Sequence, residues 1–394
     1  MKRKFRFTAL LLCISLLTCA CAATPEEERE PVVQEDASEQ DIQEEKEYQG
    51  KLDEIVPAAY NNAEGLNLEP GTYISIIGKD SDNAFWMAVK AGVKQAEEDI
   101  NKELGYEGGD KVKVTFSSPE EADNVDEQVS ILDEELARYP IALGISIADV
   151  QACEVQFDIA LENNIPIVAF DSGSEYEGIQ AMISTDNHAA GTLAATKMAD
   201  MMDGEGELIM LIHESDSEAA NARKKAFEKE IKGKYEDISV VRTISLDDLD
   251  EIKDEMIAEI QSGAYTLEAE EELTKDDISN KDVVEYVLTK HPDVKGCYTT
   301  NSLTTQLMVE GLEAKGMTDT HVIGYDAGED QLEALRDGKV DGLIVQNPFG
   351  MGYAAVIACA RAGLSIGNEA FVNTGYTWVT KSNMNDVEIE KMLY

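Results

Sequence analysis

Planar polar side chains recur in this sequence directly after short apolar runs that are typical of buried strands. The group consists of Asp171, Asn301, Asp326 and Gln346, together with Arg223 in a helical segment that follows one such run. Side chains with two donors or two acceptors in one plane suit vicinal hydroxyl groups, and an arginine beside carboxylates fixes their charge and orientation. The pattern predicts a site for a small polyol, although each Asp or Asn taken alone could equally stabilise a turn.

A second group of candidates lies in the stretch Ser81–Trp86. The apolar run Tyr73–Ile77 before it predicts a buried strand, and apolar residues at three- and four-residue spacing after it predict a helix. Asn83 can cap that helix, and the rings of Phe85 and Trp86 could cover the C–H face of a sugar ring. Ligands of open α/β sheets bind where a strand end meets a helix start. The alternative is that the two rings only pack the helix onto the sheet.

The elements that must position these residues alternate between strand and helix. The predicted strands of the first half are Tyr73–Ile77, Lys111–Phe116, Ala142–Ile147, Ile165–Phe170 and Ala181–Ser184. Those of the second half are Glu207–Ile212, Ser239–Ile244, Val294–Thr299, His321–Tyr325 and Gly342–Val345, with a last strand at Gly375–Val379. This order predicts an α/β fold of two doubly wound parallel-sheet lobes, each sheet covered by helices on both faces. Strand ends of the two lobes would be free to face each other.

The first 20 residues are predicted to be a signal peptide, because a basic start precedes the apolar segment Phe7–Leu17, which is too short to span a membrane. Thr18–Ala23 resembles a bacterial lipobox, which makes Cys21 the candidate lipid anchor; ordinary signal cleavage is the alternative. Residues 21–69 are assigned to this anchor and an acidic disordered tether, since Thr24–Gln49 is rich in Glu and Asp and poor in apolar residues.

Composition limits the classes of function. The formal net charge of -46 over 394 residues argues against nucleic acid or an anionic membrane surface as the partner, because both are bound by clustered Lys and Arg. Cys153, Cys297 and Cys359 are widely scattered, so we expect small buried hydrophobic residues rather than a disulfide or metal framework. His188 and His213, like the other two histidines, show no nucleophile–base pairing. We therefore expect no catalytic residue, no cofactor and no metal.

Short motifs follow one another in a characteristic order. They are Asp82–Trp86, Ala169–Asp171, Thr185–Gly191, Ala219–Arg223, Thr300–Ser302, Val322–Asp326, Asp337–Val340 and Val345–Pro348. Each motif is weak alone, but their shared order and spacing are specific. From about Tyr73 to Lys381, the chain resembles the periplasmic sugar-binding proteins of the ribose-binding type, in the same superfamily as the ligand-binding halves of lac-repressor-like regulators.

The resemblance implies roles for the candidate residues. Asn83, Phe85, Trp86 and Asp171 would line the site from a first lobe (70–184 plus 347–376), and Arg223, Asn301 and Asp326 from a second lobe (185–346 plus 377–394), with Gln346 near a hinge. The chain would cross between the lobes three times, near Thr185, Gln346 and Gly375. It departs from the ribose pattern at Ser172, where that family typically carries an arginine, and in the acidic insertion 263–282. The loss of that arginine leaves the identity of the sugar open.

The function that the resemblance implies is that of a solute-binding lipoprotein on the outer face of the cytoplasmic membrane. Its lobes would close on a monosaccharide or similar polyol, and the closed monomer would deliver this ligand to the permease of an ABC importer. Two alternatives remain open. One is a sensory subunit that presents its ligand to a membrane receptor or histidine kinase. The other is an anchored α/β enzyme, which would need an activated nucleophile or a metal.

Overall fold

The computed structural model describes residues 48–122, 124–267 and 273–394. The predicted signal peptide (1–20), the candidate anchor Cys21 and the predicted tether up to residue 47 lie outside the described residues. Within the described ranges, no helix combines the length and the apolar character that a membrane crossing requires. Both sheets belong to a single compact unit.

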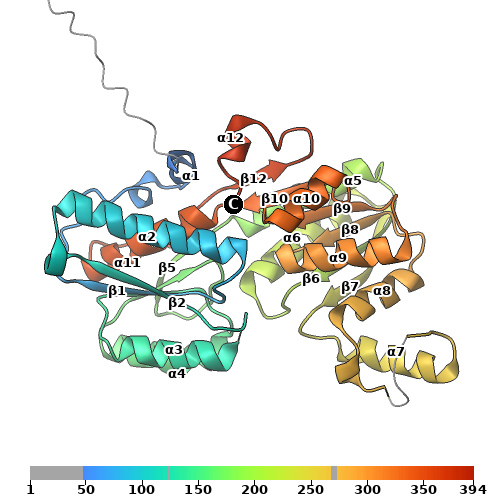
Figure 1. Cartoon of the computed structure of the whole chain (residues 1–394), viewed down its shortest axis with the longest axis horizontal. Coiled ribbons are helices and arrows are strands. Elements are labelled where there is room, and N and C mark those ends of the chain that lie inside the picture. The colour runs from blue at the N-terminus through green and yellow to red at the C-terminus, as the bar shows by residue number, and fades with distance from the viewer. Residues whose placement is uncertain (1–47, 123, 268–272) are drawn as a thin grey trace, which may run out of the picture. The chain divides into compact units, whose positions relative to one another are not determined.

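The first lobe is a parallel six-stranded sheet between two helix layers (Figure 1). Its strand order is β11-β5-β4-β3-β1-β2, with bounds β1 Tyr73–Ile77, β2 Lys113–Ser117, β3 Leu143–Ile145, β4 Ile167–Phe170, β5 Ile179–Ser184 and β11 Phe371–Asn373. Helices α2 (Ala84–Leu104) and α11 (Pro348–Gly363) cover one face, and α3 (Val125–Leu136) and α4 (Val150–Glu162) cover the other.

The second lobe repeats this plan with the strand order β12-β10-β9-β8-β6-β7. Its strands are β6 Gly206–Ile212, β7 Ile238–Ser245, β8 Gly296–Thr299, β9 His321–Tyr325, β10 Gly342–Gln346 and β12 Tyr376–Val379. One face carries α5 (Asn187–Met201) and α6 (Glu218–Lys234), and the other carries α7 (Asp250–Ser262), α8 (Asn280–Lys290), α9 (Ser302–Lys315) and α10 (Glu329–Asp337). The predicted two-lobed α/β fold is confirmed. Its second sheet is not purely parallel, because β12 pairs antiparallel with β10.

Strand β6 shows why these sequences form doubly covered sheets. Its side chains alternate between the two faces: Leu208, Met210 and Ile212 pack under α5 and α6, whereas Ile209 and Leu211 join the core on the opposite face. Because both faces are buried, the strand is apolar at every one of these positions. The apolar runs from which the strands are predicted arise because both faces of each strand are buried.

Helices α2 and α11 cross at a pair of glycines. A Cβ at Gly92 would lie 2.0 Å from the Phe349 carbonyl oxygen, and one at Gly352 would lie 2.0 Å from the Val89 carbonyl oxygen. No side chain fits into this contact, so the two helix backbones touch. The close crossing attaches α11, which follows the second lobe in sequence, firmly to the first lobe.

Three chain segments connect the lobes, as predicted. The chain crosses after β5 at Thr185, after β10 at Gln346, and between β11 and β12 at Thr374–Gly375. The segments are hydrogen-bonded to one another: Thr185 Oγ1 donates to Gln346 Oε1 at 3.2 Å, and Asn347 Nδ2 donates to the Thr374 carbonyl at 2.8 Å. The three crossing segments are therefore linked side by side.

The structure corrects the predicted end of the tether at residue 69. Residues from Tyr48 onward pack onto the first lobe, beginning with α1 (Gln49–Asp53). Leu52, Ile55 and Tyr60 are fully buried in the core that α2 and α11 cover. Val56 also exchanges two backbone hydrogen bonds with Asn373 of β11. The assignment failed because the acidic composition before residue 49 was extended over a segment whose apolar residues are well spaced for burial.

The described part of the acidic insertion 263–282 packs onto the second lobe. Residues 268–272 lie outside the described residues. The ring of Tyr265 contacts that of Tyr286 edge to face at 5.0 Å, and Ile278 is buried in the same core. Ser279 then caps α8 with a capping box that includes Asp282. The insertion is therefore an attached part of this lobe at both of its ends.

Candidate functional site

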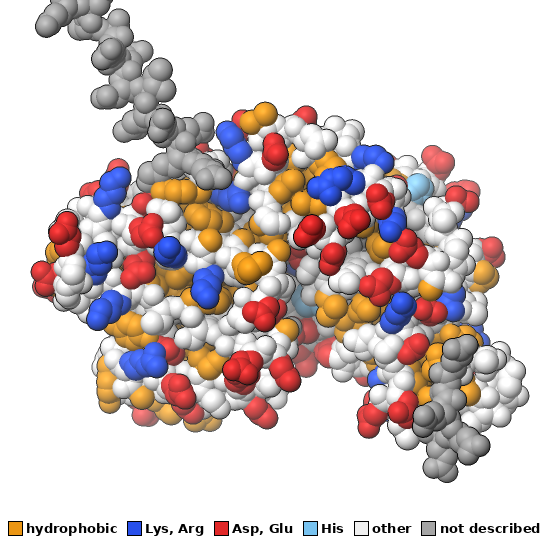
Figure 2. All heavy atoms as spheres, in the orientation of Figure 1, with side chains coloured by type: hydrophobic (Ala, Val, Ile, Leu, Met, Phe, Trp, Pro, Cys, Tyr) orange, Lys and Arg blue, Asp and Glu red, His pale blue; other side chains and the backbone are white. Residues whose placement is uncertain are grey.

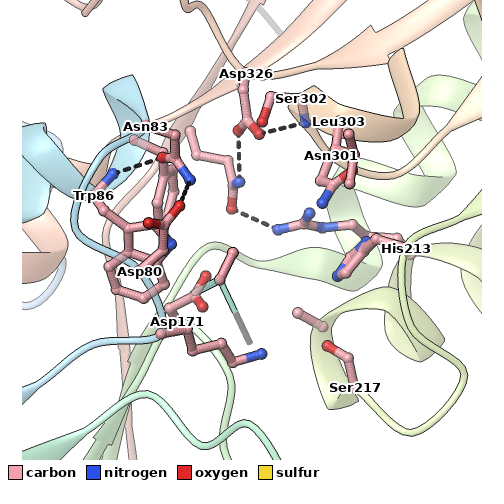
Figure 3. A pocket seen from close by; sticks show the side chains of 16 residues that line it. Asp80, Asn83, Trp86, Asp171, His213, Ser217, Asn301, Ser302, Leu303 and Asp326 are labelled. Atoms are coloured by element: carbon pink, nitrogen blue, oxygen red, sulfur yellow. Dashed lines mark hydrogen bonds between the residues drawn. The ribbon is translucent and has the colours of Figure 1, made fainter. Parts of the chain in front are cut away.

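All eight predicted site residues lie in the wall of one cavity of about 130 Å³ (Figure 3). They are Asn83, Phe85, Trp86, Asp171, Arg223, Asn301, Asp326 and Gln346. The first four come from the first lobe, the next three from the second, and Gln346 from the end of β10 at the hinge. The cavity lies at the carboxyl ends of strands in both sheets, where parallel sheets bind ligands.

The two rings of the aromatic wall pack into the core of the first lobe and also border the cavity. Phe85 is 8% exposed and Trp86 6% exposed, and both join the core of the first lobe while lining the cavity. Their rings meet edge to face at 5.2 Å. Asn83 caps α2 by accepting from Trp86 N at 3.0 Å, and its Nδ2 donates to Asp80 Oδ2 at 2.5 Å. Helix packing therefore fixes the rings that border the cavity.

The two site aspartates occupy equivalent places in the two lobes. Asp171 follows β4 with φ of 57°, and Asp326 follows β9 with φ of 73°. This left-handed conformation is uncommon outside glycine, although Asp and Asn tolerate it best. Asp171 Oδ2 accepts from Ser146 Oγ at 2.9 Å, and no described residue donates to Asp171 Oδ1.

A hydrogen-bond network holds Arg223 in the second wall. Its Nε donates to Asn187 Oδ1 at 2.8 Å, Nη1 to the Thr300 carbonyl at 2.6 Å, and Nη2 to Gln346 Oε1 at 2.5 Å. The guanidinium also stacks over the Tyr325 ring, 4.4 Å from its centroid. These contacts use three of the five N–H groups of an arginine, which leaves two for a ligand.

Asn301 and Asp326 complete this wall. Asn301 Oδ1 caps α9 by accepting from Thr304 N at 2.9 Å, and no described residue accepts from its Nδ2. Asp326 Oδ1 accepts from Gln346 Nε2 at 2.9 Å and Oδ2 from Ser302 N at 2.9 Å. Burial raises the pKa of the Asp326 carboxyl above its usual value, while the Arg223 charge opposes that rise.

The structure adds wall residues that the sequence reasoning missed, above all Lys79, Asp80, His213 and Ser217. Lys79 and Asp80 lie in the loop after β1, which ends at Ile77, and His213 directly follows β6, so the strand-end rule could have found all three. His213 Nδ1 lies 2.8 Å from Thr300 Oγ1. Burial lowers the pKa of His213 well below 6.5, and the charges of Arg223 and Lys79 lower it further, so the ring is neutral.

Two side-chain contacts join the lobes beside the cavity. Lys79 Nζ of the first lobe lies 3.3 Å from Glu214 Oε2 of the second, and these side chains are 7% and 19% exposed. Ser172 Oγ lies 3.4 Å from Ser217 Oγ across the same gap. Ser172, where the resemblance to the ribose-binding type leads us to expect an arginine, therefore meets the opposite lobe, and Lys79 of the same lobe lines the cavity.

Among the described residues, no group of three or more His, Cys, Asp and Glu side chains could hold a metal ion. Cys153, Cys297 and Cys359 are buried, as predicted, and burial raises the thiol pKa of Cys153 to about 11 and of Cys297 to about 12. They remain protonated and unreactive at neutral pH.

Fold and site define a two-lobed α/β protein with a polar cavity between its lobes. The chain belongs to the family described as periplasmic binding protein domain, whose model matches residues 74–364. This membership places the protein outside the cytoplasm, and it is a binding protein rather than an enzyme.

Curated relatives and solved structures agree with this family. The chain is 22% identical over 283 residues to the ribose import binding protein RbsB of Escherichia coli, covering 72% of this chain and 82% of that protein. It is 22% identical over 288 residues to the D-allose-binding periplasmic protein of the same species, with 71% and 80% covered. A solved carbohydrate transporter solute-binding protein from Agrobacterium radiobacter, in complex with D-arabinose, is 25% identical with a TM-score of 0.67, covering 82% of this chain and 99% of that one.

Proposed function

We propose that this protein captures a monosaccharide or a similar small polyol between its lobes and delivers it to the permease of an ABC importer. The main support for the proposal is a set of hydrogen-bonding groups in the cavity wall that have no partner among the described residues. Asp171 Oδ1 can accept, Asn301 Nδ2 can donate, and Arg223 has two further N–H groups. A hydroxyl group both donates and accepts, so neighbouring hydroxyls on one ring match such a mixture.

Cavity size and the aromatic wall support the same ligand class. At about 10–15 Å³ for each water-sized group, 130 Å³ accommodates roughly ten groups, the size of a pentose or hexose. Phe85 and Trp86 supply an apolar surface for the C–H face of the ring. Relatives named for ribose and D-allose and a structure with bound D-arabinose point in the same direction.

The binding roles of the eight predicted residues belong to this proposal. Because ligand would contact both lobes only when they are closed, its binding would shift the protein toward the closed form. A thermal-shift screen of the domain from Tyr48 to Tyr394 against pentoses, hexoses and polyols tests the ligand class. A ligand at a hundred times its dissociation constant adds about 2.7 kcal/mol of stability. No shift with any member of the panel, and no heat of binding by calorimetry, would refute the proposal.

Asp171→Asn is the matching test of the site. The substitution keeps the shape but removes the charge of an acceptor, so we expect at least a tenfold weaker affinity for the sugar that the screen identifies. Asp341→Asn is the control, because Asp341 lies at the opposite end of β10 and accepts from Val322 N at 2.9 Å. Equal affinity of both variants and the wild type would remove Asp171 from the site.

Lipid anchoring through Cys21 is part of the same proposal. The basic and apolar start of the chain and the residues around Cys21 support export followed by attachment of a lipid. Expression of the full chain and of Cys21→Ser, followed by membrane fractionation and mass spectrometry, tests it. We expect only the unsubstituted chain to fractionate with membranes and to carry the mass of a lipid.

A further inference from the structure

The segment that follows β12 connects the two lobes a fourth time, through contacts rather than through the backbone. It contains α12 (Val387–Glu390) and packs Met384 into the core of the second lobe. It then reaches the first lobe, where the Leu393 carbonyl accepts from Lys51 Nζ at 3.1 Å. Tyr394 packs against the hydrophobic cores of both lobes.

Tyr394 stands directly behind two residues of the cavity wall, one from each lobe. Its hydroxyl donates to Asp326 Oδ1 at 3.0 Å, and its ring meets the Phe85 ring edge to face at 6.3 Å. The Asp326 carboxylate thus receives Tyr394 OH and Gln346 Nε2 on one oxygen and Ser302 N on the other. Of about four acceptor positions on a carboxylate, three are occupied and one remains for a ligand.

We propose that Tyr394 is a positioning residue of the ligand site, which orients the Asp326 carboxylate and ties it to Phe85 of the opposite lobe. Its phenol does not line the cavity and so acts through Asp326. Burial and the neighbouring Asp326 charge raise the pKa of Tyr394 well above 10, which keeps its hydroxyl a donor. The effect on ligand affinity rests on the proposed function, whereas the effect on Asp326 does not.

Ser302 provides a readout of Asp326 that needs no ligand. Its N–H lies in the first turn of α9, where helical N–H groups have no partner within the helix, and it donates to Asp326 Oδ2 at 2.9 Å. If Tyr394 holds Asp326 in place, Tyr394→Phe will loosen this bond and speed amide hydrogen exchange at Ser302. The phenylalanine ring keeps the packing against Phe85, so the fold is preserved.

Tyr353→Phe is the matched control. Tyr353 is buried, whereas Tyr394 is half-buried, and the Tyr353 hydroxyl donates to Asp99 Oδ2 at 3.1 Å between α11 and α2, away from the cavity. Both variants therefore lose one phenol-to-carboxylate hydrogen bond. We expect Tyr394→Phe to increase Ser302 exchange severalfold and Tyr353→Phe to leave it at the wild-type rate.

Affinity provides the second readout, with D-ribose, D-allose and D-arabinose as probes in calorimetry. For any of these that the wild type binds, we expect Tyr394→Phe to weaken binding by about tenfold and Tyr353→Phe to leave it unchanged. Wild-type Ser302 exchange in Tyr394→Phe, or unchanged affinity for a bound probe, would overturn the positioning role. If the wild type binds no sugar, the proposed function fails by itself and Ser302 exchange alone decides the role of Tyr394.

Discussion

The ion pair between Lys79 and Glu214 should set how strongly the closed form is favoured. Glu214 does not line the cavity, so a change there affects the ligand only through closure or through Lys79. The two charged atoms lie 3.3 Å apart across the gap between the lobes. Opening of the hinge would separate these two atoms. We therefore predict that Glu214→Gln weakens ligand binding although it removes no group from the cavity wall.

The expected size follows from the geometry. At 3.3 Å and an effective dielectric constant of 20, the gross attraction is about 5 kcal/mol. The cost of removing these side chains from water, where they are now 7% and 19% exposed, offsets most of this attraction. The remaining coupling energy is about 1–2 kcal/mol, a value between those of surface ion pairs and of fully buried ones. If the free protein is mostly open, loss of this coupling weakens ligand binding by its full amount, and the dissociation constant becomes about 5 to 30 times larger.

A double-mutant cycle measures this coupling. Calorimetry with the sugar that the screen identifies gives the dissociation constants of the wild type, Lys79→Met, Glu214→Gln and the double variant. The cycle removes any direct effect of Lys79 on the ligand, because that effect is common to both backgrounds. We expect the double variant to bind about as well as the weaker single variant. Strict additivity of the two losses, within about 0.3 kcal/mol, would show that the pair does not contribute to closure.

Three further predictions concern His213, Trp86 and Gly92. His213 is neutral in the folded protein but gains a proton near pH 6.5 in the unfolded chain, so the free energy of unfolding should fall below pH 6.5 by up to about 1.4 kcal/mol per pH unit. Urea titrations should show a smaller fall for His213→Gln than for the wild type. Equal falls in the two proteins would contradict this. Trp86 borders the cavity, so its fluorescence should change on sugar binding; a flat signal from a sugar that calorimetry shows to bind would argue against closure around it. Gly92→Ala should lower the free energy of unfolding by at least 1–3 kcal/mol, because its methyl group would meet the Phe349 carbonyl; unchanged stability in urea would refute so close a crossing.

The sequence predicts the sheets well because strands that are buried on both faces form short, continuous apolar runs. Strands such as β6 are apolar at successive positions, and their alternation with helices identifies two parallel-sheet lobes. The same logic places Asp171 and Asp326, since both directly follow such strands. Arg223 does not directly follow a strand. It is placed in the site because it lies in the helix after β6 and in a motif that resembles one of the sugar-binding proteins.

What the sequence does not predict depends on contacts between distant segments. His213 could have been placed at the strand end from the sequence, but its hydrogen bond could not, because its partner Thr300 is 87 residues away. Tyr394 lies 68 residues from Asp326 and belongs to no periodic pattern. Strand β11 has only three residues, Phe371–Asn373, too few for an alternation to be recognised. In each case the tertiary partner, rather than local composition, decides the role.

Gln346 shows how the hinge and the site are physically one structure. It lies at the second crossing, and its Oε1 accepts from Thr185 Oγ1 of the first crossing and from Arg223 Nη2 of the cavity wall. Its Nε2 donates to Asp326 Oδ1. Gln346 also pairs with Tyr376 in the second sheet, so its amide is part of the second lobe that holds Arg223 and Asp326 in place. Because Thr185 of the first crossing is bonded to this same amide, the hinge is linked directly to the two charged groups of the cavity wall.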